Sequence, residues 1–258
     1  MAFTLEQRKH NVFIGLTVIF IANAILAEII GVKIFSFEQL MGWAPAQIPL
    51  IGGLKLDINL SAGVVLWPIV FILTDVINEY FGRVGVRKIT FLSVGAITYG
   101  FLILYIVTGL PPAGFWVENN TLDIAGNPYN INSAFSSIFT QGMNIIFASL
   151  TTFVISQFLD ATIFHHFKRI TGNRLIWLRA TGSTFISQLV DSFLILFLAF
   201  YVLGNWSIQQ VISVGIIQYL YKISAAVLLT PLIYLAHSFI DNYLGKKEAE
   251  QIIETVDE

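Results

Sequence analysis

Cysteine is absent from the 258 residues of this sequence, which excludes disulfides, iron–sulfur clusters and thiolate metal sites. Charge is scarce as well, because Asp, Glu, Lys and Arg together make up only 12% of the chain, about half of the fraction in ordinary soluble domains. The short motifs of P-loop nucleotide hydrolysis, dinucleotide binding, serine hydrolases and zinc peptidases are also missing. We therefore expect neither an enzyme nor a self-contained ATP-driven pump, and neither a cofactor nor a metal site.

Long apolar runs take up most of the chain instead. Hydrophobic residues make up 56% of it, and the mean hydropathy is +0.76. Each of six runs is at least as long as the ~20 residues that a helix needs to cross ~30 Å of hydrocarbon. We predict an all-α membrane protein with six transmembrane helices, forming a single polytopic domain over residues 1–258. The expected spans are residues 12–32, 60–80, 89–110, 134–160, 180–203 and 211–240.

The basic residues predict the orientation of these spans. Most Lys and Arg residues lie before the first run, between the second and third, between the fourth and fifth, and after the sixth. Because basic loops stay on the cytoplasmic side, both termini should be cytoplasmic, with residues 246–258 as an acidic tail that is helical or frayed and solvated. A cleaved signal peptide is the alternative for the first run. That run continues past Ala24 and contains Glu28, which favours a membrane span.

Two longer loops should lie on the opposite side of the membrane. Residues 33–59 contain Gly52 and Gly53 between segments in which apolar and polar residues alternate, which predicts a short external hairpin between the first two spans. Residues 111–132 are rich in Pro, Gly and Asn and should form an irregular loop.

Ionisable residues inside the expected spans are the first candidates for function, because charges in hydrocarbon are expensive and usually face a partner or a path. Glu79 and Asp160 are near span ends, where contact with the membrane surface is an alternative explanation. Asp191 and Lys222 lie at similar depth near the midplane, so we expect an ion pair or a shared polar cavity, with a purely structural pair as the alternative. The full set is Glu28, Asp75, Glu79, Asp160, Asp191 and Lys222.

A short repeat links the fourth and fifth spans. Ser156-Gln157-x-x-Asp160 recurs as Ser187-Gln188-x-x-Asp191, and residues three apart share one face of a helix. Repeated halves that meet at a midplane site are common in transporters, whereas polar contacts between helices alone are the simpler explanation. We expect the repeated Gln and Asp residues to recognise a polar solute, with unequal roles for the two carboxylates.

The segment from Trp67 to Gly82 resembles the signature P-x-x-F-x-x-T-D-x-x-x-E-x-x-G of the queuosine precursor transporters, which belong to the vitamin uptake transporter superfamily. The two copies of the Ser-Gln-x-x-Asp repeat also resemble segments of this family. So do Tyr219-x-x-Lys222 and the following Thr230-Pro231. The resemblance extends from about Gly63 to Tyr234.

This resemblance implies six spans in a bacterial plasma (inner) membrane and import of 7-deazaguanine bases for salvage into a modified tRNA nucleoside. The alternative is a substrate-binding subunit of a multi-component vitamin or purine-like solute importer. Carboxylates, amides, a cation and aromatic rings would suit the edge and face of a guanine-like base, although another purine or a pterin fits equally. The expected partners are this small molecule and the lipid bilayer, with no nucleic acid, and a homo-oligomer is compatible with the sequence. The expected substrate-binding residues are Asp75, Glu79, Gln157, Asp160, Arg179, Gln188, Asp191 and Lys222.

Overall fold

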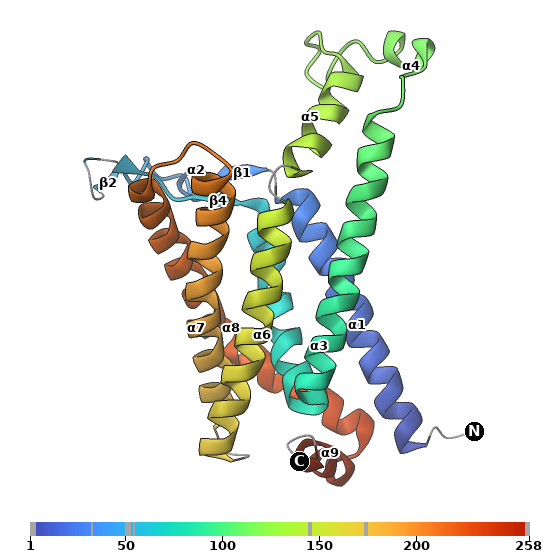
Figure 1. The fold of residues 1–258 in the computed structure, drawn as a ribbon, viewed down its shortest axis with the longest axis vertical. Helices are drawn as coiled ribbons and strands as arrows, with labels where there is room; N and C mark the ends of the chain where they lie inside the picture. Colours follow the sequence, from blue (N-terminus) through green and yellow to red (C-terminus); the bar gives the residue numbers. More distant parts are fainter. Residues whose placement is uncertain are drawn as a thin grey trace.

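The computed structural model describes residues 4–31, 33–49, 53, 55–143, 146–172 and 175–255. Long helices dominate this part of the chain, and five of them are long and apolar enough to cross a membrane (Figure 1). The protein is thus an α-helical membrane protein, as the apolar runs predict. The five helices are α1 (Leu5–Ile30), α3 (Trp67–Thr108), α6 (Ile146–Thr171), α7 (Ile176–Leu196) with its π-helical continuation η3 (Phe197–Val202), and α8 (Ile208–Leu244).

The helix α3 consists of two helices that meet at Gly82. This residue has φ 60° and ψ −164°, outside the helical region. Leu73 and Ile89 pack in the same hydrophobic cluster, although a straight helix would separate them by ~24 Å. The second half therefore runs back beside the first, as Figure 1 shows. The basic segment 83–88, expected as a loop, is helical.

The expected span 134–160 is wrong in its position. The helix α6 covers Ile146–Thr171, and a separate short helix, α5 (Ile131–Met143), precedes it. Hydropathy places a span where apolar residues lie. The helix continues beyond that region, because backbone hydrogen bonds extend α6 through the polar segment from His165 to Thr171. Asp160, expected near a helix end, consequently lies near the middle of α6.

Short elements cover the upper end of the bundle in Figure 1. The expected span 60–80 begins late, because α3 starts at Trp67 and extended and 3₁₀ structure precede it. Two antiparallel strand pairs form there, β1 with β4 and β2 with β3. Val32 and Gly52, which belong to the expected first span and hairpin, lie outside the described residues. The short elements are β1 (Ile34–Ser36), α2 (Phe37–Leu40), β2 (Ile48–Pro49), β3 (Lys55–Leu56), β4 (Asn59–Ser61), η2 (Ala62–Val65) and α4 (Gly114–Glu118).

A buried carboxylate organises the segment between α1 and α3. Glu38, only 2% exposed, accepts hydrogen bonds from the Ser36 hydroxyl at 3.0 Å and from the backbone nitrogen of Ala46 at 3.4 Å. It also accepts one from the backbone nitrogen of Ile58. These bonds satisfy backbone donors of a segment with little regular structure, so Glu38 is a structural residue.

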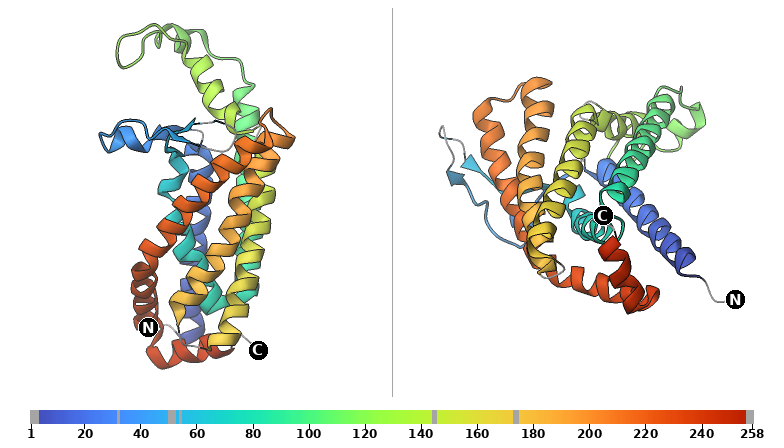
Figure 2. Two further views of the ribbon diagram at one scale, coloured as in Figure 1. Left: turned by 90° about the vertical axis from the view of Figure 1, so that its left-hand side faces the viewer. Right: turned by 60° about the horizontal axis from the view of Figure 1, so that its bottom comes forward.

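The helix α9 (Lys246–Thr255) lies across the base of the bundle (Figure 2). Ala249 and Ile252 are buried and pack in one cluster with Tyr80. A helical form of the tail is therefore confirmed as far as Thr255, but the expectation that the tail is only a solvated end is wrong, because the bundle covers these two side chains. The segment is acidic overall, but its apolar residues recur at helical spacing and form one face that the bundle covers.

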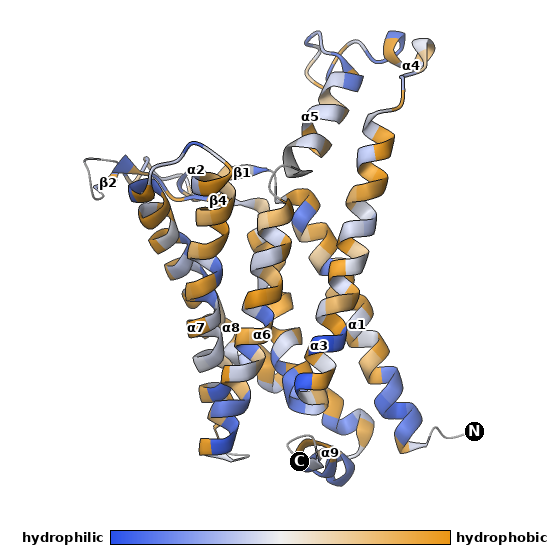
Figure 3. Ribbon diagram, viewed as in Figure 1, coloured by the Kyte–Doolittle hydropathy of each residue, from blue (hydrophilic) through white to orange (hydrophobic). Residues whose placement is uncertain are grey.

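Apolar side chains cover the outer surface of the long helices. Figure 3 shows hydrophobic residues along their middle sections and hydrophilic residues gathered near the lower ends of α3, α6 and α7 and in α9. Val18, Tyr99, Leu228 and Phe239 are each more than half exposed. Such a surface suits contact with lipid. Charged side chains lie mainly at the helix ends and in the interior.

Candidate functional site

Buried polar side chains lie at three levels inside the bundle. At the lower end in Figure 1, where the chain passes from α6 to α7, lies a group that we call the lower network. Two carboxylates near the middle form the central pair, and an ion pair closer to the opposite end forms the upper pair. The lower network consists of Glu79, Tyr80, Lys168, Arg179, His237 and Asp241, the central pair of Asp75 and Asp160, and the upper pair of Asp191 and Lys222.

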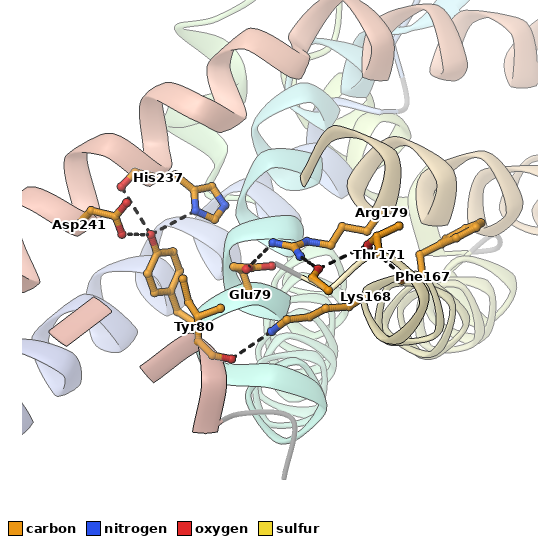
Figure 4. Close-up of polar contacts among 10 residues, drawn as sticks. Glu79, Tyr80, Phe167, Lys168, Thr171, Arg179, His237 and Asp241 are labelled. Carbon is orange, nitrogen blue, oxygen red and sulfur yellow. Dashed lines mark hydrogen bonds and ion pairs between the residues drawn. The ribbon is translucent and has the colours of Figure 1, made fainter. Parts of the chain in front are cut away.

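An ion pair between α3 and α7 forms the centre of the lower network (Figure 4). Arg179 Nη2 lies 2.5 Å from Glu79 Oε1, and both side chains are only 1% exposed. Arg179 Nη1 also donates to the backbone oxygen of Gly172 at 2.8 Å, just beyond the end of α6. Because an isolated charge in hydrocarbon is costly, pairing explains how both charges can be buried. The contact joins α3, α7 and the end of α6.

Two further side chains connect the lower network to α8 and α9, as Figure 4 shows. Tyr80 on α3 donates from Oη to Asp241 Oδ1 at 2.5 Å and lies 3.1 Å from His237 Nδ1. Lys168 on α6 donates from Nζ to the backbone oxygen of Ile253 at 3.2 Å. Hydrogen bonds that involve charged groups are stronger than neutral ones. The lower end of the bundle is therefore closed by polar contacts among five helices.

The two carboxylates of the central pair differ in their hydrogen bonds: Asp160 accepts two, whereas one oxygen of Asp75 accepts none. Asp160 accepts from Asn78 Nδ2 at 3.3 Å and from Ser187 Oγ at 3.0 Å. Asp75 is within electrostatic range of Asp160 and is only 3% exposed. Among the described residues, neither Asp75 Oδ1 nor Asn78 Oδ1 has a hydrogen-bond partner. Unpartnered buried polar atoms are rare and often mark a place where a ligand or water binds.

Asp75 lines a small cleft between α3, α7 and α8. The space in it is enough for about one water molecule. A planar base could fill it only if the helices moved apart. The other lining residues are Phe71, Ile72, Thr181, Thr184, Ala226, Leu229 and Ile233.

The upper pair joins α7 to α8. Lys222 Nζ bonds to Asp191 Oδ2, and Lys222 is fully buried whereas Asp191 is 21% exposed. The same ammonium lies 3.8 Å from the centre of the Trp67 ring, a cation–π contact of a desolvated cation. The predicted contact between Asp191 and Lys222 is thus confirmed, although it lies beside the first residue of α3 rather than at the expected midplane. Glu28 on α1 lies within electrostatic range of Asp191 and accepts from Ser149 Oγ at 2.5 Å.

The family model described as "Putative vitamin uptake transporter" matches residues 61–236. The chain belongs to the vitamin uptake transporter family. It is 31% identical to a "Probable queuosine precursor transporter" of Bacillus subtilis, over 70% of this chain and 73% of that protein. It is 24% identical to a "Queuosine precursor transporter" of Escherichia coli, over 65% of this chain and 68% of that protein. No solved structure matches the chain significantly.

The segment that matches the vitamin uptake transporter family contains both halves of α3 and all of α6 and α7, and with them the central and upper pairs. His237, Asp241 and α9 lie just beyond it. The protein is a multi-pass membrane protein whose family matches are bacterial transporters.

The repeat of Ser, Gln and Asp does not form two equal sites. Asp160 from the first copy bonds to Ser187 from the second, whereas Asp191 bonds to Lys222. Gln157 lines a separate small space beside Phe20 and Thr74, and Gln188 is half-buried on α7. The helices α6 and α7 run in opposite directions, so equivalent positions in the two copies lie at different depths.

Sequence reasoning did not identify Asn78, Tyr80, Trp67 or His237 as parts of these groups. Asn78 and Tyr80 flank Glu79, and a polar residue next to a buried acid could have been noticed. His237 follows a long apolar run, where an isolated imidazole stands out. Trp67, the first residue of α3, packs against Lys222. Within the described residues, no group of three or more His, Asp or Glu side chains is arranged to hold a metal ion.

Proposed function

We propose that this member of the vitamin uptake transporter family imports queuosine precursors, which are 7-deazaguanine bases. The names of its relatives support this. The observation that carries the proposal is the buried carboxylate of Asp75, which lines a cleft in the matched segment with one oxygen unpartnered.

The chemistry of a guanine-like base suits this cleft. Such a base presents a ring N–H and an exocyclic amine side by side, and a carboxylate accepts both in a two-point contact. In our proposal Asp75 makes this contact, Phe71 covers the flat face of the base, and the hydroxyls of Thr181 and Thr184 bond to its remaining edge. Because the cleft is tight, α7 and α8 must separate from α3 to admit the base and close again behind it.

The other expected residues act around this contact in the proposal. Glu79 and Arg179 hold the lower end closed until the base is released, and Asp191 and Lys222 hold α7 to α8 while they move together. Asp160 stays bonded to Asn78 and Ser187. Gln157 lines a separate space and Gln188 is half-buried on α7, so neither contacts the base in this proposal.

We infer six spans with both termini in the cytoplasm. The two halves of α3 supply two of the six crossings, so the start of α1 and the helix α9 lie at the same end (Figure 1). Lys and Arg residues are concentrated at that end, which supports a cytoplasmic location. The strand pair β2–β3 is then an external hairpin.

Binding to purified protein tests the substrate and the role of Asp75. We expect cyano- and aminomethyl-deazaguanine to bind more tightly than a pterin. Asp75→Asn should weaken binding by ~10- to 100-fold. The amide places a donor against the donors of the base, and leaving these groups unpaired costs ~1–3 kcal/mol of binding free energy. Glu28→Gln is the matched control, because Glu28 is a carboxylate outside the cleft that bonds to Ser149. Equal affinity of wild type and Asp75→Asn would contradict the assignment.

Uptake by the chain alone separates the two classes of importer. A solitary transporter should move the base into proteoliposomes that contain no other protein. A substrate-binding subunit would bind the base but require an ATPase module to move it. Binding without uptake would therefore favour the second class.

A further inference from the structure

The central pair carries more negative charge than its surroundings compensate. Asp75 lies on the same face of α3 as Asn78, which donates to Asp160, and as Glu79 one turn further on. Arg179 is already engaged by Glu79 and by the backbone oxygen of Gly172. The residues of α8 that line the cleft are all apolar, namely Ala226, Leu229 and Ile233. If both carboxylates stayed ionised once water is excluded, they would repel each other, and a proton on one of them would remove the repulsion.

The two carboxylates differ in how well they can accept that proton. Asp160 is held between Asn78 and Ser187. The hydroxyl of Ser187 can accept as well as donate. Asn78 Oδ1 is fully buried and has no partner among the described residues, so a rotation of this amide presents an acceptor to a protonated Asp160. Asp160 therefore has partners in either protonation state.

Whether the cleft is empty or holds a base determines which protonation state of Asp160 is favoured. An empty cleft admits about one water molecule, which can hydrate the Asp75 carboxylate. A base that fills the cleft displaces this water and needs Asp75 ionised to accept its two N–H groups. The repulsion between Asp75 and Asp160 then grows, because charges interact more strongly where water is excluded.

We propose that Asp160 takes up one proton when a base occupies the cleft at Asp75, so that each base crosses the membrane together with one proton. The proton comes from the solvent on the side of binding and leaves with the base on the other side, while the N–H protons of the base stay on the base. The site takes a proton rather than a metal ion, because the space is small and no group of three or more acidic or histidine ligands occurs among the described residues. This inference rests on the proposed function.

Proton uptake on binding is the direct test. Deazaguanine is added to purified, weakly buffered wild-type protein near neutral pH, and the change in pH is measured with an indicator dye. We expect close to one proton taken up per base bound. Asp160→Asn should still bind the base but take up no proton, and the control Glu28→Gln should behave like wild type.

A gradient experiment tests the same proposal without a variant. Proteoliposomes of wild-type protein with an alkaline interior should accumulate the base up to about tenfold for a gradient of about one pH unit, and a protonophore should abolish this accumulation. Replacing sodium with choline should change nothing. Binding without proton uptake, or accumulation driven by sodium, would overturn the coupling and leave the proposed function intact. Absence of binding by wild type would overturn both.

Discussion

Lys222 is a fully buried cation held between the carboxylate of Asp191 and the ring of Trp67. Removing one partner of a buried ion pair leaves the other charge uncompensated, which costs more than the pair itself contributes. Replacing both partners with neutral groups avoids this penalty. The upper pair can therefore be tested separately for its effects on stability and on transport.

We expect Asp191→Asn and Lys222→Met each to lower the free energy of unfolding by about 3 kcal/mol. The double variant should lose clearly less free energy of unfolding than the two single variants lose together, because neither charge is left without its partner. Chemical unfolding in detergent measures the stabilities. If the single effects simply add, the two side chains do not interact in the folded protein. Uptake should recover less than stability, since the double variant no longer joins α7 to α8 by charge.

The sequence could predict which residues are functional candidates better than it could predict their partners. Asp75, Asp160, Asp191 and Lys222 stand out because charges are rare in apolar runs. The contact of Asp160 with Ser187 depends on how α6 and α7 are rotated about their axes. The hydropathy of the sequence carries no information about this rotation.

Among the elements, α3 depends on the backbone of one residue. Gly82 has φ 60° and ψ −164°, a conformation that is essentially restricted to glycine. It lets two helices meet with no loop between them. The apolar runs predicted both crossings, but they could not show that the connection is a single non-helical residue.

Gly82→Ala should lower the free energy of unfolding by ~1–3 kcal/mol, because a Cβ atom is strained in this conformation. Gly100→Ala is the matched control within the same helix. A Cβ added at Gly100 would meet no atom within 4 Å, so this change should be neutral or stabilise by up to ~1 kcal/mol. Thermal unfolding in detergent compares the two variants. Equal stability would show that the bend at Gly82 tolerates a side chain.

The helix α9 should detach when its apolar face is made polar. Ile252→Ser removes a buried side chain from the cluster that contains Tyr80 and should cost about 2 kcal/mol or more. The matched control is Gln251→Ser, at an exposed position on the same helix. Hydrogen exchange of the α9 amides should accelerate in the first variant only. Unchanged protection would mean that other contacts, such as the one from Lys168, hold α9 in place.

At the scale of the whole molecule, the arrangement of both ends can be tested directly because the native chain contains no cysteine. Asn119→Cys lies after α4 and Glu254→Cys lies on α9, and both positions are exposed. In intact cells, a membrane-impermeant thiol reagent should label the first position and reach the second only after the membrane is opened. The reverse pattern would invert the proposed topology, and labelling of both in intact cells would exclude the three crossings (α6, α7 and α8) proposed between these positions.

The connection at Gly82 also has a consequence for how the chain enters the bilayer during synthesis. The first half of α3 contains Asp75 and Glu79, and an acidic residue at the centre of an inserting helix costs ~2.5–3.5 kcal/mol. The second half is strongly apolar from Ile89 onwards and is joined to the first by one non-helical residue. Neither half can therefore leave the insertion machinery far ahead of the other. The two halves should enter the lipid as a preformed hairpin, in which the apolar second half draws in a first half that would insert poorly by itself.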